Sequence, residues 1–255
     1  MPLEIVTIPC LSDNYAFLVH ETESGQTAVV DVPEAAPIVA ELNKRNWALS
    51  EVWLTHHHWD HVDGLPELLA DHPAKVVGAK ADAHRLPKLD RAVSDGDVFS
   101  FGGEPVHILD VSGHTIGHIA LHLPETAALF TADSLMTLGC GRLFEGTPAQ
   151  MFDSLQKTST MPGTTIVYSG HEYTTSNAAF AATVDPENAA LISRSRDIAA
   201  KRANRQPTVP SSLQLERETN PFLRAHDPEI QAQLNMVGAA PVDVFTEIRA
   251  RKDRF

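Results

Sequence analysis

Thr55-His56-His57-His58-Trp59-Asp60-His61 directly follows Val52-Trp53-Leu54, an apolar segment with the character of a buried strand. In an extended segment alternate side chains share a face, so His56 and His58 point one way and His57 points the other way. Asp60 and His61 lie where the chain turns into the next helix, and they can converge on a second point nearby. Because the cations of two-metal sites lie roughly 3.5–4 Å apart, this run predicts a two-metal hydrolytic site rather than a histidine-rich surface loop.

Two metals need more ligands than this run supplies, and three later segments offer them. His114 comes after the expected strand at 106–109, Asp133 after the one at 129–131, and His171 after the one at 166–168. A single histidine after a strand is more often structural, but three donors placed in the same way favour a shared site. We expect His118 to be an outer partner of a ligand or the start of a strand. The remaining histidines are expected to be structural or exposed.

Hydrophobic periodicity predicts an α/β protein. Strands are expected at 5–8, 15–19, 28–31, 52–55, 76–77, 98–101, 106–109, 119–123, 129–131 and 166–168. Helices are expected at 37–43, 64–71, 148–158, 176–184, 187–205, 228–236 and 242–252. After residue 173 the chain changes from short strand-like segments to alanine-rich helical ones. This change of composition predicts a catalytic domain at 1–173 and a smaller helical domain at 174–255.

Composition narrows the function classes. The 255 residues are 43% apolar, which is enough for a sizeable core. A formal charge of −13 disfavours nucleic acid as a partner. The first residues lack the order of a signal peptide, and no apolar run approaches the roughly 20 residues that span a bilayer, so we expect a cytoplasmic protein with no membrane partner. Cys10 and Cys140 are too few for a disulfide framework and fit buried thiols in a reducing compartment.

The order of the motifs THHHWDH, SGHTIGH, TAD and SGHE resembles that of the metallo-β-lactamase superfamily, whose fold is an αββα sandwich. The resemblance implies that His56, His58 and His114 bind the first metal, that Asp60, His61 and His171 bind the second, and that Asp133 bridges the two. Imidazole and carboxylate ligands accept zinc, iron or manganese, so the expected cofactors are two divalent cations, with zinc as the first choice. Asp60 and Asp133 are the catalytic candidates, and Asp60 can serve either as a ligand or as a proton acceptor.

Within the superfamily the chain is similar to glyoxalase II, the hydroxyacylglutathione hydrolases, over essentially its whole length. The resemblance rests on Gly139-Cys140-Gly141-Arg142-Leu143-Phe144-Glu145-Gly146-Thr147, Gly170-His171-Glu172-Tyr173-Thr174, Thr219-Asn220-Pro221-Phe222-Leu223-Arg224 and the closing Arg249, Arg251, Lys252 and Asp253. It implies hydrolysis of S-(2-hydroxyacyl)glutathione, such as S-D-lactoylglutathione, to glutathione and a 2-hydroxy acid such as D-lactate, in methylglyoxal detoxification. A hydroxide that bridges the metals would attack the thioester carbonyl.

The same resemblance supplies the substrate-binding residues. It implies that Arg249 and Lys252 bind the glutathione carboxylates, that Tyr173 contacts the peptide near the thiol, and that Arg142 and Phe144 line the pocket. Without it, cations at the end of the last helix would be expected merely to oppose the helix dipole. The family often has lysine at the position of Arg142 and tyrosine at that of Phe144, which puts substrate affinity in question rather than reaction type. The expected partner is a small glutathione thioester, bound by a monomer.

Three alternatives remain open at this stage. A mononuclear iron persulfide dioxygenase of the same superfamily is the first, and the second-metal set Asp60, His61 and His171 argues against it. A β-lactamase or an RNA-processing hydrolase is the second, and the glutathione-type carboxyl-terminal region argues against both. A metal-binding protein without enzymatic activity is the third.

Overall fold

The computed structural model describes residues 3–255, and within this range the chain divides into two compact units. Unit 1 extends to Asp110 and resumes at Ile116–Thr131. Unit 2 comprises Val111–Thr115 and Ala132–Phe255. The domain division expected between residues 173 and 174 rests on the change in sequence composition, and it stays a prediction.

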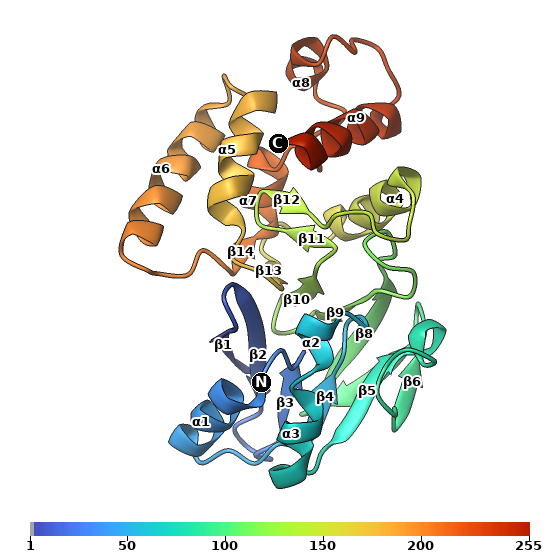
Figure 1. Ribbon diagram of the computed structural model, residues 1–255, viewed down its shortest axis with the longest axis vertical. Helices are drawn as coiled ribbons and strands as arrows, with labels where there is room; N and C mark the ends of the chain where they lie inside the picture. Colours follow the sequence, from blue (N-terminus) through green and yellow to red (C-terminus); the bar gives the residue numbers. More distant parts are fainter. Residues whose placement is uncertain (1–2) are drawn as a thin grey trace. The chain divides into compact units, whose positions relative to one another are not determined.

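One sheet of unit 1 has the strand order β1-β2-β3-β4-β5-β6 (Figure 1). Its strands are β1 (Glu4–Cys10), β2 (Asn14–His20), β3 (Thr27–Val30), β4 (Glu51–Trp53), β5 (Lys75–Ala79) and β6 (Arg91–Val93). The pairs from β1 to β3 are antiparallel and those from β3 to β6 are parallel. β2 and β3 are buried along their whole length, as expected for strands covered on both faces. The histidine motif therefore begins just beyond the carboxyl end of an interior parallel strand, β4.

The second sheet of unit 1 is antiparallel, with the order β10-β9-β8-β7. Its strands are β7 (Val98–Phe101), β8 (Glu104–Asp110), β9 (Ile119–Leu123) and β10 (Ala128–Ala132). Aromatic rings join the two sheets, because Trp53 contacts Phe99 and Phe101 with centroid distances of 5.7 and 5.0 Å. Phe17 contacts Phe130 in the same way at 5.6 Å. The two sheets therefore pack face to face as a sandwich.

Helices connect the parallel strands of the first sheet, as parallel crossovers require. α1 (Ala35–Arg45) joins β3 to β4, and α2 (Trp59–Val62) and α3 (Leu65–Asp71) join β4 to β5. α1 lies beside α3 (Figure 1). Ile38 and Leu42 on α1 are fully buried. Asn46 ends the helix in the left-handed conformation, which asparagine tolerates better than most residues.

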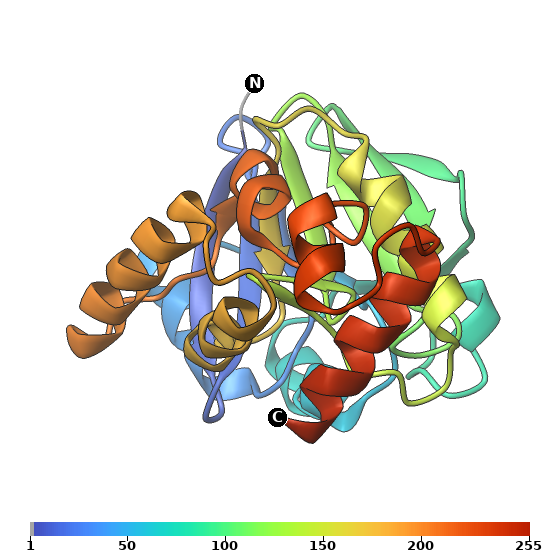
Figure 2. The ribbon, with the colours of Figure 1, turned by 90° about the horizontal axis from the view of Figure 1, so that it is seen from above.

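Unit 2 is mainly helical, with short strand pairs. Its elements are β11 (Leu135–Met136), β12 (Gly139–Cys140), α4 (Pro148–Ser159), β13 (Ile166–Ser169), α5 (Thr174–Val184), α6 (Ala189–Ala203), β14 (Ser211–Ser212), α7 (Leu213–Thr219), α8 (Pro228–Gln233) and α9 (Pro241–Arg254). β11 pairs with β12, and β13 pairs with β14. Figure 2 shows α5 and α6 lying side by side. Phe180, Phe222 and Phe245 form the aromatic centre of the core, with successive centroid distances of 6.1 and 5.7 Å.

The observed elements confirm the predicted α/β class, and each expected strand and helix has a counterpart. The expected list lacked β6, β11, β12, β14, α2, α7 and η1 (Lys80–Asp82), all of them short. α7 does have a sequence signal, because the Ser212 side chain accepts a hydrogen bond from the Leu215 N–H as a helix N-cap. Among the described residues, no helix combines the length and apolar character needed to cross a membrane.

Candidate metal centre

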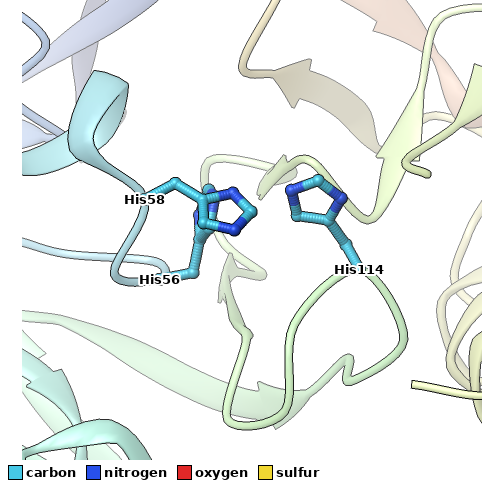
Figure 3. A group of neighbouring side chains, drawn as sticks. All are labelled: His56, His58 and His114. Carbon is cyan, nitrogen blue, oxygen red and sulfur yellow. The ribbon is translucent and has the colours of Figure 1, made fainter. Parts of the chain in front are cut away.

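The first donors follow β4 in unit 1. His56 and His58 lie on the loop that leads from this strand into α2 (Figure 3), and their rings are 4.8 Å apart. Asp60 and His61 lie within α2, where His61 Nε2 is 3.9 Å from Asp60 Oδ2. His56 and His61 are completely buried, and a buried imidazole needs partners for its nitrogens.

Asp31, which directly follows β3, is the hydrogen-bond partner of one of these imidazole nitrogens. Its Oδ2 lies 2.8 Å from His61 Nδ1 and also accepts from the Thr55 hydroxyl at 2.8 Å, while its Oδ1 accepts from the Thr55 N–H. The Thr55 hydroxyl in turn lies 3.0 Å from His56 Nδ1. Outer groups thus engage Nδ1 of both histidines, and such partners usually fix the ring of a metal-binding histidine so that its other nitrogen faces the metal.

His57, whose ring centroid lies 5.0 Å from that of His58, is engaged by a residue outside the donor set. Its Nδ1 lies 2.8 Å from Oδ2 of Asp82, whose other oxygen accepts from Arg85 Nε at 2.6 Å. His118 is completely buried and stacks on His56 with ring centroids 4.5 Å apart. The structure therefore places His118 against a ligand candidate and directly before β9, and its role as an outer partner stays a prediction.

Unit 2 holds the other donors, His114, Asp133 and His171, which are all buried. His114 lies on the loop between β8 and β9 (Figure 3), and its Nδ1 faces the Arg142 carbonyl at 2.7 Å. Asp133 Oδ2 is 3.5 Å from His114 Nε2 and 3.3 Å from His171 Nε2. Metal bonds of about 2.1 Å at a tetrahedral angle separate two ligand atoms by about 3.4 Å. The Asp133 oxygen therefore stands at ligand-to-ligand distance from both imidazoles.

The backbone around Asp133 leaves no room for a side chain at position 141. A Cβ on Gly141 would lie 1.9 Å from the Asp133 carbonyl oxygen and 2.9 Å from His114 Nδ1. Real Cβ atoms do not approach backbone atoms so closely, so glycine is required here. The Gly-Cys-Gly-Arg segment can therefore pass directly behind two of the donors.

The basic residues predicted to bind substrate have different environments in unit 2. Arg249 is buried, and its guanidinium donates to the Cys140 carbonyl at 2.9 Å and to Asp253 Oδ1 at 2.8 Å. Lys252 Nζ lies 3.2 Å from the Ser176 carbonyl and 5.2 Å from the centroid of the Phe180 ring. Burial, reinforced by the neighbouring guanidinium of Arg249, lowers the pKa of Lys252 to about 8.

The other substrate-binding candidates are more exposed. Tyr173 stacks on His171 with ring centroids 4.6 Å apart and an interplanar angle of 8°. Phe144 is 61% exposed, although its ring edge contacts His114. Arg142 is also exposed and faces Asp253 at 3.7 Å. The substrate roles of these residues, and those of Arg249 and Lys252, stay predictions.

The donor set suits a pair of divalent cations. Within unit 1, Asp31, His56 and His61 form a group of three potential metal ligands whose donor atoms lie within 4.8 Å of one another. Asp31 belongs to this group but is already engaged by His61 and Thr55, so it acts as an outer partner. Such clusters of histidine and aspartate are typical of a binuclear metallo-β-lactamase site. Sequence reasoning missed Asp31 and Asp82, because an aspartate at a strand end or in a turn has no local signal that distinguishes it.

The sandwich and its strand-end donors define a metallo-β-lactamase superfamily protein with the αββα fold. The family model "Metallo-beta-lactamase superfamily" matches residues 13–171, and the model "Hydroxyacylglutathione hydrolase C-terminus" matches residues 172–255. The chain belongs to the hydroxyacylglutathione hydrolase family. It is 66% identical to the hydroxyacylglutathione hydrolase of Ruegeria pomeroyi and 63% identical to that of Roseobacter denitrificans, with 100% of each chain covered in both comparisons.

A solved structure supports the same fold. The B3 metallo-β-lactamase BLEG-1 superposes with a TM-score of 0.67, at 17% identity, over 86% of this chain and 99% of that chain. At this low identity the likeness concerns the fold alone. The family models and the relatives confirm the resemblance of the whole chain to the hydrolases, and the superposition confirms the fold.

Proposed function

We propose that this chain hydrolyses S-(2-hydroxyacyl)glutathione, with S-D-lactoylglutathione as the physiological example, to glutathione and a 2-hydroxy acid. The observation that carries the proposal is the full-length match to hydroxyacylglutathione hydrolases together with the intact set of histidine and aspartate donors. D-Lactate would be the acid product, and methylglyoxal detoxification the setting.

Each metal would draw ligands from several segments of the chain. We propose His56, His58 and His114, the residues drawn in Figure 3, for the first cation. Asp60, His61 and His171 are proposed for the second, with Asp133 bridging the two. The position of Asp133 Oδ2 at similar distances from His114 and His171 supports the bridging role. Zinc is the proposed metal, since it favours tetrahedral sites of imidazole and carboxylate, and iron and manganese are its competitors.

The chain's own residues prepare the reaction. Two bound cations would lower the pKa of a water and offset charge developing on the substrate carbonyl oxygen. Asp31 and the Arg142 carbonyl hold His61 and His114 in fixed orientations, which limits reorganisation during the reaction. The leaving group is a thiolate whose conjugate acid has a pKa of about 8.5 as in free cysteine, so no strong general acid is required from the protein.

Unit 2 offers the charges that would hold the glutathione moiety. Lys252 is proposed to bind a carboxylate directly, because its ammonium group is only partly buried. Arg249 is proposed to support the same carboxylate from its buried position beside Cys140 and Asp253. Tyr173, Arg142 and Phe144 are proposed to line the path of the peptide. The helical region 174–255 would thus be the glutathione-binding domain.

The persulfide dioxygenase alternative loses support, because residues 172–255 match the carboxyl-terminal model of the hydrolases. The free, buried thiols of Cys10 and Cys140 support the proposed cytoplasmic location, where disulfides are rare. A monomer is proposed as the functional form, and size-exclusion chromatography with light scattering would test it.

The decisive experiment counts metals and measures thiol release on the same preparation. We expect about two zinc ions per chain and release of free thiol from S-D-lactoylglutathione, with both lost on chelation and restored by zinc. The variant His107→Gln is a matched control, because His107 lies within β8, opposite Val98 of β7 and His122 of β9, and is proposed to bind neither metal nor substrate. Two bound metals without thiol release would overturn the proposed substrate. One iron with oxygen consumption on a glutathione persulfide would instead establish the dioxygenase.

A further inference from the structure

Asn14, the first residue of β2, directs its side-chain amide at Asp60. Its Nδ2 donates to the Asp60 carbonyl oxygen at 2.9 Å and to Asp60 Oδ2 at 3.1 Å. Asn14 is only 3% exposed, and 46 residues separate it from its partner along the chain. One amide group thus holds both the main chain and the carboxylate of a residue proposed to bind the second metal.

Asp60 needs such support because the element that bears it is weak on its own. α2 comprises only Trp59–Val62, and its N-cap residue His58 makes no side-chain capping bond. A single helical turn has little intrinsic stability, and an unrestrained aspartate samples several staggered rotamers. Two hydrogen bonds from a buried amide restrict both the position of the turn and the direction of the carboxylate.

The chemistry of the amide suits this task. Asparagine is neutral, so it stabilises the ionised carboxylate by hydrogen bonding without neutralising its charge. A lysine or arginine in the same place would form an ion pair and weaken the attraction of Asp60 for a cation. A carboxylate oxygen has more than one lone pair, so the oxygen that accepts from Asn14 can still bind a cation.

Asn14 is itself anchored. It pairs with Cys10 in the β1–β2 register, and the intervening turn is tied to the start of α1 by the Leu11 N–H, which donates to Glu34 Oε1 at 2.7 Å. The amide therefore projects from a sheet and a braced turn rather than from a mobile loop. Rigid support is what a metal ligand needs in order to keep its geometry before the metal arrives.

We propose that Asn14 is a positioning residue that preorganises Asp60 for the second metal. This inference rests on the proposed function, and it assigns to the β1–β2 turn a part in metal binding. Loss of an outer partner typically reduces metal affinity or activity by about 10- to 100-fold. We expect an effect of that size confined to the Asp60 metal, with KM for the thioester nearly unchanged.

Two variants of Asn14 separate this role from simple packing. Asn14→Leu keeps the size of the side chain but removes both donors. Asn14→Asp keeps the shape and places a second carboxylate beside Asp60. Asn188→Asp is a matched control, because Asn188 Nδ2 also donates to a carboxylate, that of Asp185, and to a carbonyl, that of Glu218, at the start of α6.

The test titrates each metal-free protein with Zn²⁺ against a chromophoric chelator, and records the visible absorption of the Co²⁺-loaded forms. We expect two tight zinc ions in the wild-type chain and in Asn188→Asp. Both Asn14 variants should keep one tight zinc, bind the second about 10- to 100-fold more weakly and change the cobalt spectrum of that site. Their melting temperatures in the metal-free state report packing separately.

Wild-type affinity for both zinc ions and an unchanged kcat in Asn14→Leu would overturn the inference, and so would equal weakening of both metals. A variant that is destabilised without metal but binds both zinc ions normally would show a purely structural role, and would overturn it as well. If the wild-type chain itself binds fewer than two zinc ions, the two-metal proposal fails instead, and the titration of the unmodified protein reveals this directly.

Discussion

Oδ2 of Asp133 lies 3.3 Å from Nε2 of His171, and the same oxygen lies 3.5 Å from Nε2 of His114. A hydrogen bond would be shorter than either distance. Both separations instead match the spacing of about 3.4 Å between two ligands of one tetrahedral metal. The structure therefore presents one carboxylate oxygen as a neighbour of two ligand candidates, which agrees with the bridging role proposed for Asp133.

Replacement of Asp133 should accordingly affect both metals, unlike replacement of a ligand to one. For Asp133→Asn we expect weaker binding of both zinc ions and a fall in kcat of more than about 100-fold, beyond the usual effect of an outer partner. Metal analysis after gel filtration and steady-state thiol release are the measurements. Full retention of one zinc would show that Asp133 serves a single metal.

The candidate donors could be located from the sequence because they are histidines and aspartates that follow expected strands; their roles as ligands stay predictions. Their outer partners could not be located in this way. Asp31 lies 30 residues from His61, and Asn14 lies 46 residues from Asp60. Only the folded sheet brings these pairs together, so the local sequence around an aspartate or asparagine has no signal for them.

The burial of the basic residues near the carboxyl terminus could not be predicted from the sequence either. The sequence presents Arg249 and Lys252 as equivalent cations at the end of a helix. In the folded chain Arg249 is buried against the Cys140 carbonyl, whereas Lys252 is partly exposed beside Ser176. Which face of α9 packs inward depends on its contact with α4, where Phe152 meets Phe245. That contact is a tertiary one, beyond the reach of helix periodicity alone.

Lys252 gives a prediction for pH dependence. Burial and the nearby Arg249 lower its pKa from 10.5 to about 8, so its charge is present below pH 8 and is lost as the pH rises. If Lys252 binds a glutathione carboxylate, KM should rise up to about 10-fold between pH 7 and pH 9, as the charged fraction falls. Lys252→Arg stays charged over this range and should flatten the KM profile. An identical rise in KM for the arginine variant would assign the titration to another group.

The lowered pKa of Lys252 also predicts the direction of the stability change. Between about pH 8 and 10.5 the unfolded chain holds a proton on this lysine that the folded chain has released. The unfolded state therefore binds more protons, and this group favours the folded state increasingly as the pH rises through that window. Denaturant unfolding of the wild type and of Lys252→Met at pH 7.5 and 9.5 measures the difference. A steeper rise in stability for the methionine variant would contradict it.

Glu216 predicts a stability effect that leaves metal binding intact. It is completely buried, forms an ion pair with Arg194, and accepts hydrogen bonds from the Leu138 N–H and from Asn220. Glu216→Ala leaves a buried guanidinium without its counter-charge, which costs about 3–5 kcal/mol. At roughly 2–4 °C per kcal/mol for a chain of this size, Tm should fall by about 6–20 °C.

The control for Glu216 lies two residues away. Glu218 is exposed, so Glu218→Ala should change the free energy of unfolding by less than about 0.5 kcal/mol. Scanning calorimetry and zinc analysis on both variants complete the comparison. A fall in Tm of similar size in the two variants would show that the Arg194–Glu216 pair is not the source of the effect.

Phe144 tests how the glutathione moiety is held. Its ring is 61% exposed and its edge contacts His114, at a position where many members of the family are expected to carry tyrosine. Phe144→Tyr adds a hydroxyl that can donate to the bound peptide, and one such hydrogen bond contributes about 0.5–1.5 kcal/mol. KM for S-D-lactoylglutathione should therefore fall by about 2- to 10-fold, with kcat nearly unchanged, because the contact is the same in the ground and transition states.

A lactoyl thioester of a small thiol, which lacks the peptide, should show no change in KM. An equal fall in KM for both thioesters would place the new hydroxyl at the acyl group instead of at the glutathione.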